Sequence, residues 1–391
     1  MCAQTGQGCY LLNGDINIKK EWLLAACAVL ITMAAALALL RWLAPQLLGI
    51  PVDLQLVQAS KTVPPFFEGI FREQDYATDN LLLHDPYTST RFRPLLPEDK
   101  GTGPHDILGF RNAGVPNSAA IVILGDSQTY GVGEPYASSW PSQMSTLLHK
   151  QDTSVYSMSV GGWAALQYLD MFSKAARLGP RTVIIAYYTG NDPLETFAMA
   201  YGNEHWAGFR VDPGIDKTDA PQVPSMLSVE DAWPVKFSDG IRIAFTPRGR
   251  LAINNTDHPA VQAGYDIMAE VARRIGELAR QQDIAVIFTV IPTRELAYAK
   301  KVAQEQLDAP DTYRQLVRME SGNIETLAET IRAIPGARYV DLVQPLQAAA
   351  LSDLPLYPRQ WDGHPGKEGY SVIARTLAAA ISPEEKSTTT E

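Results

Sequence analysis

Residues 119–133 have the sequence Ala-Ala-Ile-Val-Ile-Leu-Gly-Asp-Ser-Gln-Thr-Tyr-Gly-Val-Gly. The first six, Ala119–Leu124, form a continuous apolar run rich in β-branched side chains, which predicts a buried strand of a parallel sheet. The run ends at Gly125. Because open α/β sheets bind their ligands beyond the carboxyl ends of the strands, Ser127 stands where a functional serine is expected. The alternative is a turn in which Asp126 or Ser127 only caps the following helix.

Three further segments place glycines or polar residues after a strand or before a helix. They are Val155–Gly162, ending in two glycines, Thr182–Asp192, ending in Thr-Gly-Asn-Asp, and Trp361–Tyr370, containing Asp-Gly-His. A serine acts as a nucleophile only with a base to take its proton and with donors for the developing oxyanion. The chain supplies candidates for each of these roles.

The four segments in this order resemble the SGNH (GDSL-type) hydrolase family over about residues 106–381. The resemblance implies that Ser127 is the nucleophile, His364 the general base and Asp362 the residue that orients the imidazole. The spacing Asp-x-His is tighter than the family's common Asp-x-x-His. Asp353 is therefore kept as a second candidate for the orienting acid.

The resemblance also implies an oxyanion hole. Its donors would be the backbone N–H groups of Ser127 and Gly162 and the side-chain amide of Asn191, each worth about 3 kcal/mol in hydrolases. The second segment departs from the family pattern, because Ser157 stands where the family usually has asparagine.

Other histidines compete for the role of base. His258 lies in an Asp-His-Pro sequence that imitates the last segment, but strands still follow it. His149 ends a predicted helix, where the helix dipole explains it, and His205 lies in an insertion. In the SGNH family the base comes after the last strand, and His364 follows the last predicted strand here, so the resemblance favours His364 as the base.

Alternating strand and helix patterns predict an α/β fold, a three-layer α/β/α sandwich around a mostly parallel five-stranded sheet of the SGNH or flavodoxin-like type. The strands are expected at 119–124, 155–160, 182–188, 284–291 and 337–342, and helices at 137–150, 164–178, 260–281, 312–321 and 324–334. The hydrolase domain would cover residues 106–382, and residues 383–391 would form a disordered tail.

Residues 193–258 interrupt this pattern with many Pro, Gly, Asp and aromatic residues. A stretch of this length without helical periodicity predicts a functional segment, here a cap over the site with a hairpin near 235–253. Trp206 and Trp233 are candidates for stacking on sugar rings, as are Phe209 and Phe237. The alternative is that these rings only pack the cap.

The N-terminal part contains an uncharged, almost wholly apolar run at residues 22–40. Its length and the Arg-Trp that follows predict a transmembrane signal anchor over 22–42, rather than a buried helix or a cleaved signal peptide. Residues 1–21 would then be cytoplasmic, and residues 43–105 would form a tether and lead-in segment. The protein is expected to be a single-pass protein of the inner membrane, with its catalytic domain in the periplasm or outside the cell.

Composition limits the partners. The formal net charge is −10 over 391 residues, and no basic run interleaves with aromatic residues, so we expect no nucleic-acid partner. All three cysteines lie within the first 27 residues, and no metal-ligand spacing is present. We expect no metal and no cofactor; oligomeric state has no signature in the sequence.

These observations together predict a serine esterase that acts through an acyl-serine, and the resemblance implies O-acetyl groups of a polysaccharide as substrate, with water or a sugar hydroxyl as acceptor. Two alternatives remain open. One is a lipid-directed esterase or thioesterase, which an apolar groove would favour. The other is a non-enzymatic glycan-binding or assembly protein on the same fold.

Overall fold

The computed structural model describes residues 80–99, 101–149, 153–224, 232–352, 354–358 and 363–381. The strands are β1 (Leu82–Asp85), β2 (Ser89–Phe92), β3 (Ile121–Gly125), β4 (Val155–Ser159), β5 (Thr182–Tyr188), β6 (Trp233–Lys236), β7 (Arg242–Phe245), β8 (Ala285–Ile291) and β9 (Ala337–Asp341). The helices are α3 (Ser127–Tyr130), α4 (Trp140–His149), α5 (Ala165–Ala175), α6 (Asp192–Gly202), α7 (Pro247–Asn254), α8 (Pro259–Gln281), α9 (Arg294–Ala297), α10 (Ala299–Gln304), α11 (Asp311–Arg332), α12 (Val343–Leu351) and α13 (Lys367–Ile381).

The central sheet has five strands in the order β4-β3-β5-β8-β9, and every neighbouring pair is parallel. The prediction of a mostly parallel five-stranded sheet is confirmed. The order matches the doubly wound, flavodoxin-like arrangement in which the first strand of the sheet lies between the second and the third. The chain leaves β3 for β4 on one side and later crosses to β5 on the other, so β3 ends at the point where the strand order reverses.

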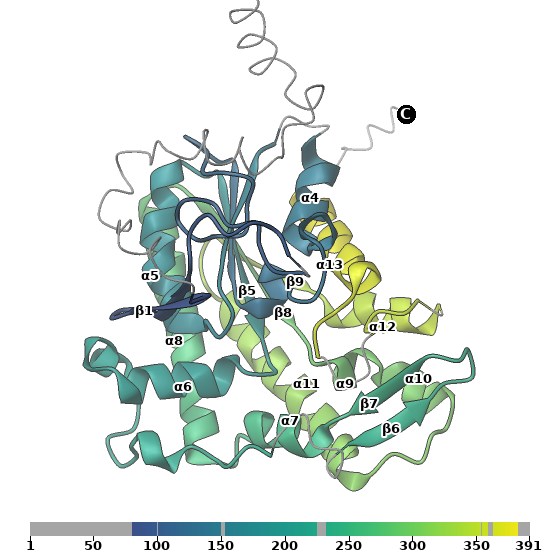
Figure 1. The fold of residues 1–391 in the computed structure, drawn as a ribbon. Helices are drawn as coiled ribbons and strands as arrows, with labels where there is room; N and C mark the ends of the chain where they lie inside the picture. The colour runs from purple at the N-terminus through teal and green to yellow at the C-terminus, as the bar shows by residue number, and fades with distance from the viewer. Residues whose placement is uncertain are drawn as a thin grey trace, which may run out of the picture. The chain divides into compact units, whose positions relative to one another are not determined.

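Alternate residues of the buried strands pack into two separate cores. In β3, Val122 and Leu124 join the larger core with residues of α5, α8 and α11, whereas Ile121 and Ile123 join the second core with residues of α4, α12 and α13. Figure 1 shows α5 and α8 on one side of the sheet and α4, α12 and α13 on the other. A strand that is buried on both faces has apolar side chains at every position. The apolar run at residues 119–124 therefore predicted β3 correctly.

One helical prediction is wrong in its boundaries. Residues 312–321 and 324–334 were expected as two helices, but α11 runs without a break from Asp311 to Arg332. A glycine inside a helix costs about 1 kcal/mol relative to alanine. Leu316, Ile324 and Leu327 are buried on both sides of Gly322, and their packing outweighs that cost.

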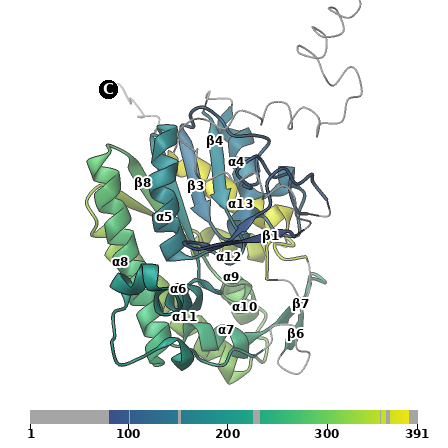
Figure 2. The same cartoon turned by 60° about the vertical axis from the view of Figure 1, so that its left-hand side comes forward.

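The insertion at 193–258 differs from the expectation at both of its ends. It begins as the helix α6, whose first turn carries Pro193 and two acidic residues, all favourable at a helix N-terminus. The expected hairpin is present as β6 and β7, but it ends at Phe245, and α7 follows. Figure 2 shows α6 and α7 beneath the sheet, close to α8 and α11.

The lead-in segment belongs to the folded body from residue 80 onward. Its hairpin of β1 and β2 is antiparallel, and its Phe92 is buried in the larger core together with Ile107, Leu108 and Phe110, which follow the segment. The predicted membrane anchor, residues 22–42, lies outside the described residues, as do residues 1–21 and the tail 383–391. Within the ranges that the structure describes, no helix has the length and apolar character needed to cross a membrane.

Candidate active site

Ser127 is the first residue of α3, directly beyond the carboxyl end of β3. Asp126 caps this short helix, since its Oδ1 accepts a hydrogen bond of 2.8 Å from the backbone N–H of Gln128. The turn leaves Ser127 partly exposed, whereas the residues on either side of it are buried. A serine at a sharp strand-to-helix turn presents its hydroxyl beyond the sheet edge, where a substrate can reach it.

His364 lies beside this serine although 237 positions separate the two in sequence. Its Nε2 is 2.8 Å from Ser127 Oγ, a normal hydrogen-bond distance, whereas Asp126 Oδ2 is 3.4 Å from the same oxygen. His364 is therefore the histidine that contacts the hydroxyl, as the predicted base would. The predicted orienting acid, Asp362, and the second candidate, Asp353, both lie outside the described residues.

The strand order brings the three predicted oxyanion donors to one edge of the sheet. Gly125 at the end of β3 is in register with Ser159 of β4 on one side and with Ala186 of β5 on the other. Ser127 therefore lies between the loop that carries Gly162 and the loop that carries Asn191. No hydrogen bond to a described residue occupies the backbone N–H of Ser127 or Gly162, and the Asn191 side chain does not cap its own helix.

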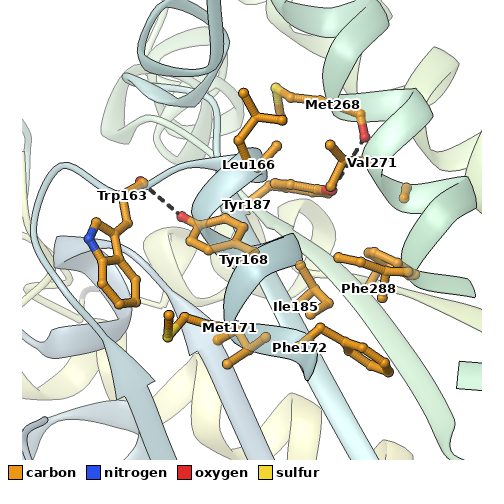
Figure 3. Packing of buried hydrophobic residues seen from close by; sticks show 14 of the residues in the cluster. Trp163, Leu166, Tyr168, Met171, Phe172, Ile185, Tyr187, Met268, Val271 and Phe288 are labelled. Carbon is orange, nitrogen blue, oxygen red and sulfur yellow. Dashed lines mark hydrogen bonds between the residues drawn. The ribbon is translucent and has the colours of Figure 1, made fainter. Parts of the chain in front are cut away.

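The first of these two loops, residues 160–164, we call the Gly162 loop. Gly162 has φ +78°, a left-handed conformation that glycine adopts without strain, and it is exposed. The next residue, Trp163, is buried, and its Nε1 donates a 2.7 Å hydrogen bond to the carbonyl of Thr90 in the β1–β2 hairpin. Figure 3 shows Tyr168 donating to the Trp163 carbonyl, a bond of 3.1 Å, above a layer of apolar side chains.

The second loop, residues 189–191, we call the Asn191 loop, and buried polar side chains hold both carbonyls that precede Asn191. Asn254 Nδ2 donates to the Thr189 carbonyl at 3.1 Å, and Arg250 Nη1 donates to the Gly190 carbonyl at 2.7 Å. Arg250 and Asn254 are four residues apart on α7, so they lie on one face of that helix.

A buried carboxylate holds the same loop from another helix. Glu320 of α11 accepts a 2.5 Å hydrogen bond from the Thr189 hydroxyl and two bonds, of 2.7 and 2.6 Å, from the backbone and hydroxyl of Thr293. Burial raises the pKa of Glu320 to about 7, although the three hydrogen bonds from Thr189 and Thr293 oppose this rise. The loop before Asn191 is thus fixed by side chains from α7 and α11.

Arg250 also touches the loop that carries His364. A Cβ built on Gly363 would lie 2.6 Å from Arg250 Nη2, so the chain just before His364 runs against the guanidinium. The guanidinium carbon lies 5.6 Å from the centre of the Tyr188 ring, at the end of β5. Arg250 therefore contacts both the Asn191 loop and the chain just before His364.

Two buried carboxyl groups flank the site, next to the nucleophile and next to Asn191. Burial raises the pKa of Asp126 to about 6, and burial together with the charge of Asp126 raises the pKa of Asp192 well above its usual value. Because the pKa values of both carboxyl groups are raised, Asp126 and Asp192 are disfavoured from being ionised at the same time. This limits negative charge near the place where an oxyanion would form.

His105 and Arg111, which lie between β2 and β3, support the chain that follows Ser127. Arg111 is buried and donates through Nη1 to the carbonyls of Tyr130 and Gly131 and through Nη2 to that of Glu134. The Tyr130 hydroxyl lies 2.7 Å from Nε2 of His105, and burial lowers the pKa of this histidine to about 4. His105 is therefore a neutral structural histidine.

A cavity of about 720 Å³ opens beside the Gly162 loop, between the β1–β2 hairpin and α6. It is lined by Gly161 and Gly162 of the loop and by Glu195 of α6, among others. Its volume lies within the range of about 300–1,000 Å³ that is common for ligand sites. The cavity is therefore large enough for a ligand next to the candidate catalytic residues.

The two tryptophans predicted to contact substrate line other parts of the molecule. Trp206 is buried and donates through Nε1 to the carbonyl of Tyr87, at the tip of the hairpin, over 2.9 Å. Trp233 packs against Phe245 and Tyr313, with ring centres 5.6 and 4.8 Å away. Neither lines the cavity beside Gly162, so their contact with substrate stays a prediction.

The rival histidines have structural partners. His258 is the N-cap of α8, where its Nδ1 accepts from the backbone N–H of Ala260. His205 packs edge-on against Tyr87 and Trp206. In the part of the chain that the structure describes, no three His, Cys, Asp or Glu side chains are grouped so that they could hold a metal ion.

Sequence reasoning missed the residues that support the site, namely Arg250, Asn254, Glu320 and Arg111. Arg250 and Asn254 carried a usable signal, because an arginine and an asparagine four positions apart face the same way on a helix. Glu320 carried none, because an acidic residue in the middle of a polar helical pattern predicts a solvated face.

Comparison with known proteins gives structural similarity only. No protein-family model matches the chain, and no curated protein matches it. The chain is similar to a solved GDSL-like lipase from Bacteroides thetaiotaomicron, at 15% identity over 67% of this chain and 86% of the other, with a TM-score of 0.34. It is also similar to a putative acylhydrolase from Bacteroides fragilis, at 16% identity, 67% and 85% coverage and a TM-score of 0.33.

A third similar structure is a catalytic mutant of an acetylxylan esterase from Geobacillus stearothermophilus. Its identity is 11%, the match covers 68% of this chain and 94% of the other, and the TM-score is 0.37. Similarity at this level carries no information about the substrate of the present chain.

Proposed function

We propose that the protein is a serine esterase in which Ser127 forms an acyl-enzyme and His364 is the general base. The observation that carries the proposal is the 2.8 Å contact between His364 Nε2 and Ser127 Oγ at the carboxyl end of the sheet. A nucleophile within hydrogen-bond distance of its base is the geometric requirement for this chemistry.

The reaction follows from the atoms in place. Ser127 Oγ attacks the ester carbonyl while His364 Nε2 takes the hydroxyl proton, and the carbonyl oxygen becomes an oxyanion. The N–H groups of Ser127 and Gly162 and the amide of Asn191 donate to it. The protonated imidazole then gives its proton to the leaving alcohol as the carbon–oxygen bond breaks. Water, or a second hydroxyl, repeats the attack on the acyl-serine and releases the acid or a new ester.

The substrate we propose is an O-acetyl group on a carbohydrate. The cavity beside Gly162 supports this choice, because His84, Ser89 and Thr90 line it together with three acidic side chains. A lipid-directed esterase or thioesterase would favour an apolar groove instead. The acetylxylan esterase among the similar structures is consistent with the proposal but does not carry it.

We also propose that the enzyme is anchored in the inner membrane by residues 22–42 and acts in the periplasm or outside the cell. This part of the proposal rests on the uncharged apolar run at 22–40 and on the lysines before it. A fusion of alkaline phosphatase after residue 60 would test it: activity of the fusion supports export, and an inactive, stable fusion contradicts it.

The esterase proposal is tested with the full-length chain in mild detergent. We expect hydrolysis of para-nitrophenyl acetate and release of acetate from acetylated xylo-oligosaccharides, with both activities lost in Ser127→Ala. Thermal unfolding of the variant should match the wild type, since the serine is partly exposed. Activity that survives in Ser127→Ala would contradict the proposed nucleophile.

A further inference from the structure

The cavity beside the Gly162 loop adjoins the candidate catalytic centre, although Ser127 and His364 are not among its lining residues. A Cβ built on Gly161, which lines the cavity, would lie 3.7 Å from the Cβ of Ser127. An acetyl group has only three non-hydrogen atoms, whereas the cavity measures about 720 Å³. Most of this space must therefore serve a part of the ligand other than the acetyl group.

One face of α6 forms the long wall of this cavity. Glu195, Ala198, Met199 and Gly202 all line it, and their spacing of three and four residues is that of a single helix face. Asn191, the predicted oxyanion donor, precedes Glu195 by four residues and lies at the start of the same face. At 1.5 Å per residue, this wall extends about 10 Å from Glu195 to Gly202.

The opposite wall is the β1–β2 hairpin, including Leu82, Asp85 and Thr90. Trp163 of the Gly162 loop is hydrogen-bonded to this hairpin, and Trp206 supports its tip. Figure 2 shows β1 crossing the molecule above α6. The cavity therefore has two walls, α6 and the β1–β2 hairpin, each held by contacts with the rest of the fold.

The charged groups on the walls are all acidic. Asp85, Glu195 and Glu204 line the cavity, and no lysine or arginine is among its lining residues. Asp85 lies 3.8 Å from Arg91 and Glu204 lies 2.6 Å from Arg210, and these arginines offset part of the negative charge. Glu195 forms no ion pair with a described residue, and of the three carboxylates that line the cavity it is the nearest to Asn191 in sequence.

We propose that this cavity binds the saccharide that carries the acetyl group, and that it accepts neutral or amino-bearing saccharides and disfavours those with carboxylates. This inference rests on the proposed esterase function. Hydroxyl-rich rings match the hydrogen-bonding groups of the lining, whereas a uronic acid would bring a like charge toward Glu195.

The first test fills the cavity. Ala198 is exposed on the α6 wall, so Ala198→Trp places an indole in the cavity without disturbing the core. We expect kcat/KM for acetylated xylo-oligosaccharides to fall at least about tenfold more than that for para-nitrophenyl acetate. Ala379→Trp, at an exposed position of α13 that does not line the cavity, should leave both values as in the wild type. Equal changes for the two substrates in Ala198→Trp would overturn the proposal.

The second test changes the charge. Wild-type kcat/KM should be at least about tenfold higher for acetylated xylo-oligosaccharides than for acetylated oligogalacturonides of the same length. Glu195→Gln should narrow this ratio, whereas Glu329→Gln, at an exposed position of α11, should not. A wild-type preference for the galacturonides, or a ratio that Glu195→Gln leaves unchanged, would contradict the charge argument.

Binding separates this proposal from the esterase proposal. In full-length Ser127→Ala, calorimetry should detect binding of unacetylated xylo-oligosaccharides, which Ala198→Trp abolishes. If the saccharide binds but the wild type hydrolyses no ester, the proposal of a saccharide-binding cavity is supported and the esterase proposal is contradicted. Ser127-dependent hydrolysis of para-nitrophenyl acetate without any saccharide binding would do the reverse.

Discussion

The Asn191 loop and the Gly162 loop lie on either side of Ser127, yet they are held by different kinds of interaction. The carbonyls before Asn191 accept hydrogen bonds from buried Arg250 and Asn254, and the Thr189 hydroxyl bonds to buried Glu320. The Gly162 loop is held mainly by the packing of Trp163 and by its Nε1 bond to the β1–β2 hairpin, with one further bond from the Tyr168 hydroxyl to the Trp163 carbonyl.

This difference indicates that the two loops have different roles. Buried charged groups are costly to leave without partners, so the polar network fixes the Asn191 loop in one conformation. The Gly162 loop, in contrast, shares a wall with the cavity and depends on a hairpin from the lead-in segment. We infer that the first loop mainly sets the rate of the chemical step, and that the second links it to substrate binding.

The largest effect on kcat is expected from removing the predicted oxyanion donor of the Asn191 loop, which is the side-chain amide of Asn191. Asn191→Ala should lower kcat for para-nitrophenyl acetate by about 10²–10³-fold, because one donor to the oxyanion is lost. Asn191→Asp should lower it at least as much, because a carboxylate opposes the oxyanion. A loss below about tenfold in folded Asn191→Ala protein, judged by circular dichroism, would remove Asn191 from the oxyanion hole.

The next effect concerns pH and the carboxylate under the same loop. Because burial raises the pKa of Glu320 to about 7 from 4.5, the folded state binds its proton more tightly than the unfolded state. The free energy of unfolding should therefore fall as pH rises from about 4.5 to 7, by up to about 3 kcal/mol from this group.

Denaturant unfolding of the wild type and Glu320→Gln at several pH values would measure this contribution. Asp106 and Asp126, whose pKa values burial raises to about 6, are present in both proteins and cancel in the difference. The two curves should converge toward low pH and separate as pH rises, with Glu320→Gln gaining relative stability. Parallel curves would show that Glu320 keeps an ordinary pKa.

A smaller effect is expected from the guanidinium that joins two catalytic loops. Arg250→Met leaves the buried carbonyl of Gly190 without its partner, which should lower the free energy of unfolding by about 1–3 kcal/mol. It should also lower kcat with little change in KM, because the positions of Asn191 and His364 both depend on it. Arg248→Met, at an exposed position of the same helix, is the matched control. A kcat equal to the wild type would show that Arg250 supports stability alone.

The smallest effect belongs to the Gly162 loop. Trp163→Phe removes the bond to the Thr90 carbonyl and should cost about 1 kcal/mol of unfolding free energy. Its effect on kcat for para-nitrophenyl acetate should be smaller than that of Arg250→Met, and its effect on acetylated xylo-oligosaccharides larger than on the aryl ester. A fall in kcat as large as that of Arg250→Met would contradict the difference between the two loops.

The apolar runs of the sequence predicted the sheet, and the resemblance to the SGNH family implied that Ser127 and His364 act together. A strand buried on both faces reads as an apolar run, and residues that follow parallel strands meet at one edge. The support of the Asn191 loop left a weaker signal, limited to the four-residue spacing of Arg250 and Asn254. Whether α7 covers the site or lies beneath it depends on tertiary packing, and periodicity does not report a buried Glu320 whose partners are 27 and 131 positions away.

The insertion at 193–258 was harder to predict for a related reason. The N-terminal signals of α6, Pro193 and the acidic first turn, were present. The helix is short, however, and its face toward the cavity interrupts the apolar pattern with Glu195. A helix that forms the wall of a cavity lacks the continuous apolar stripe that identifies a core helix.

The most direct test of the central claim is the site of covalent labelling by a fluorophosphonate, read by intact mass and peptide mapping of the full-length protein. We predict one adduct per chain, on Ser127, absent in Ser127→Ala and formed much more slowly in His364→Ala. Labelling at another residue, or labelling of Ser127 at the same rate in His364→Ala, would contradict the assignment of Ser127 as a nucleophile activated by His364.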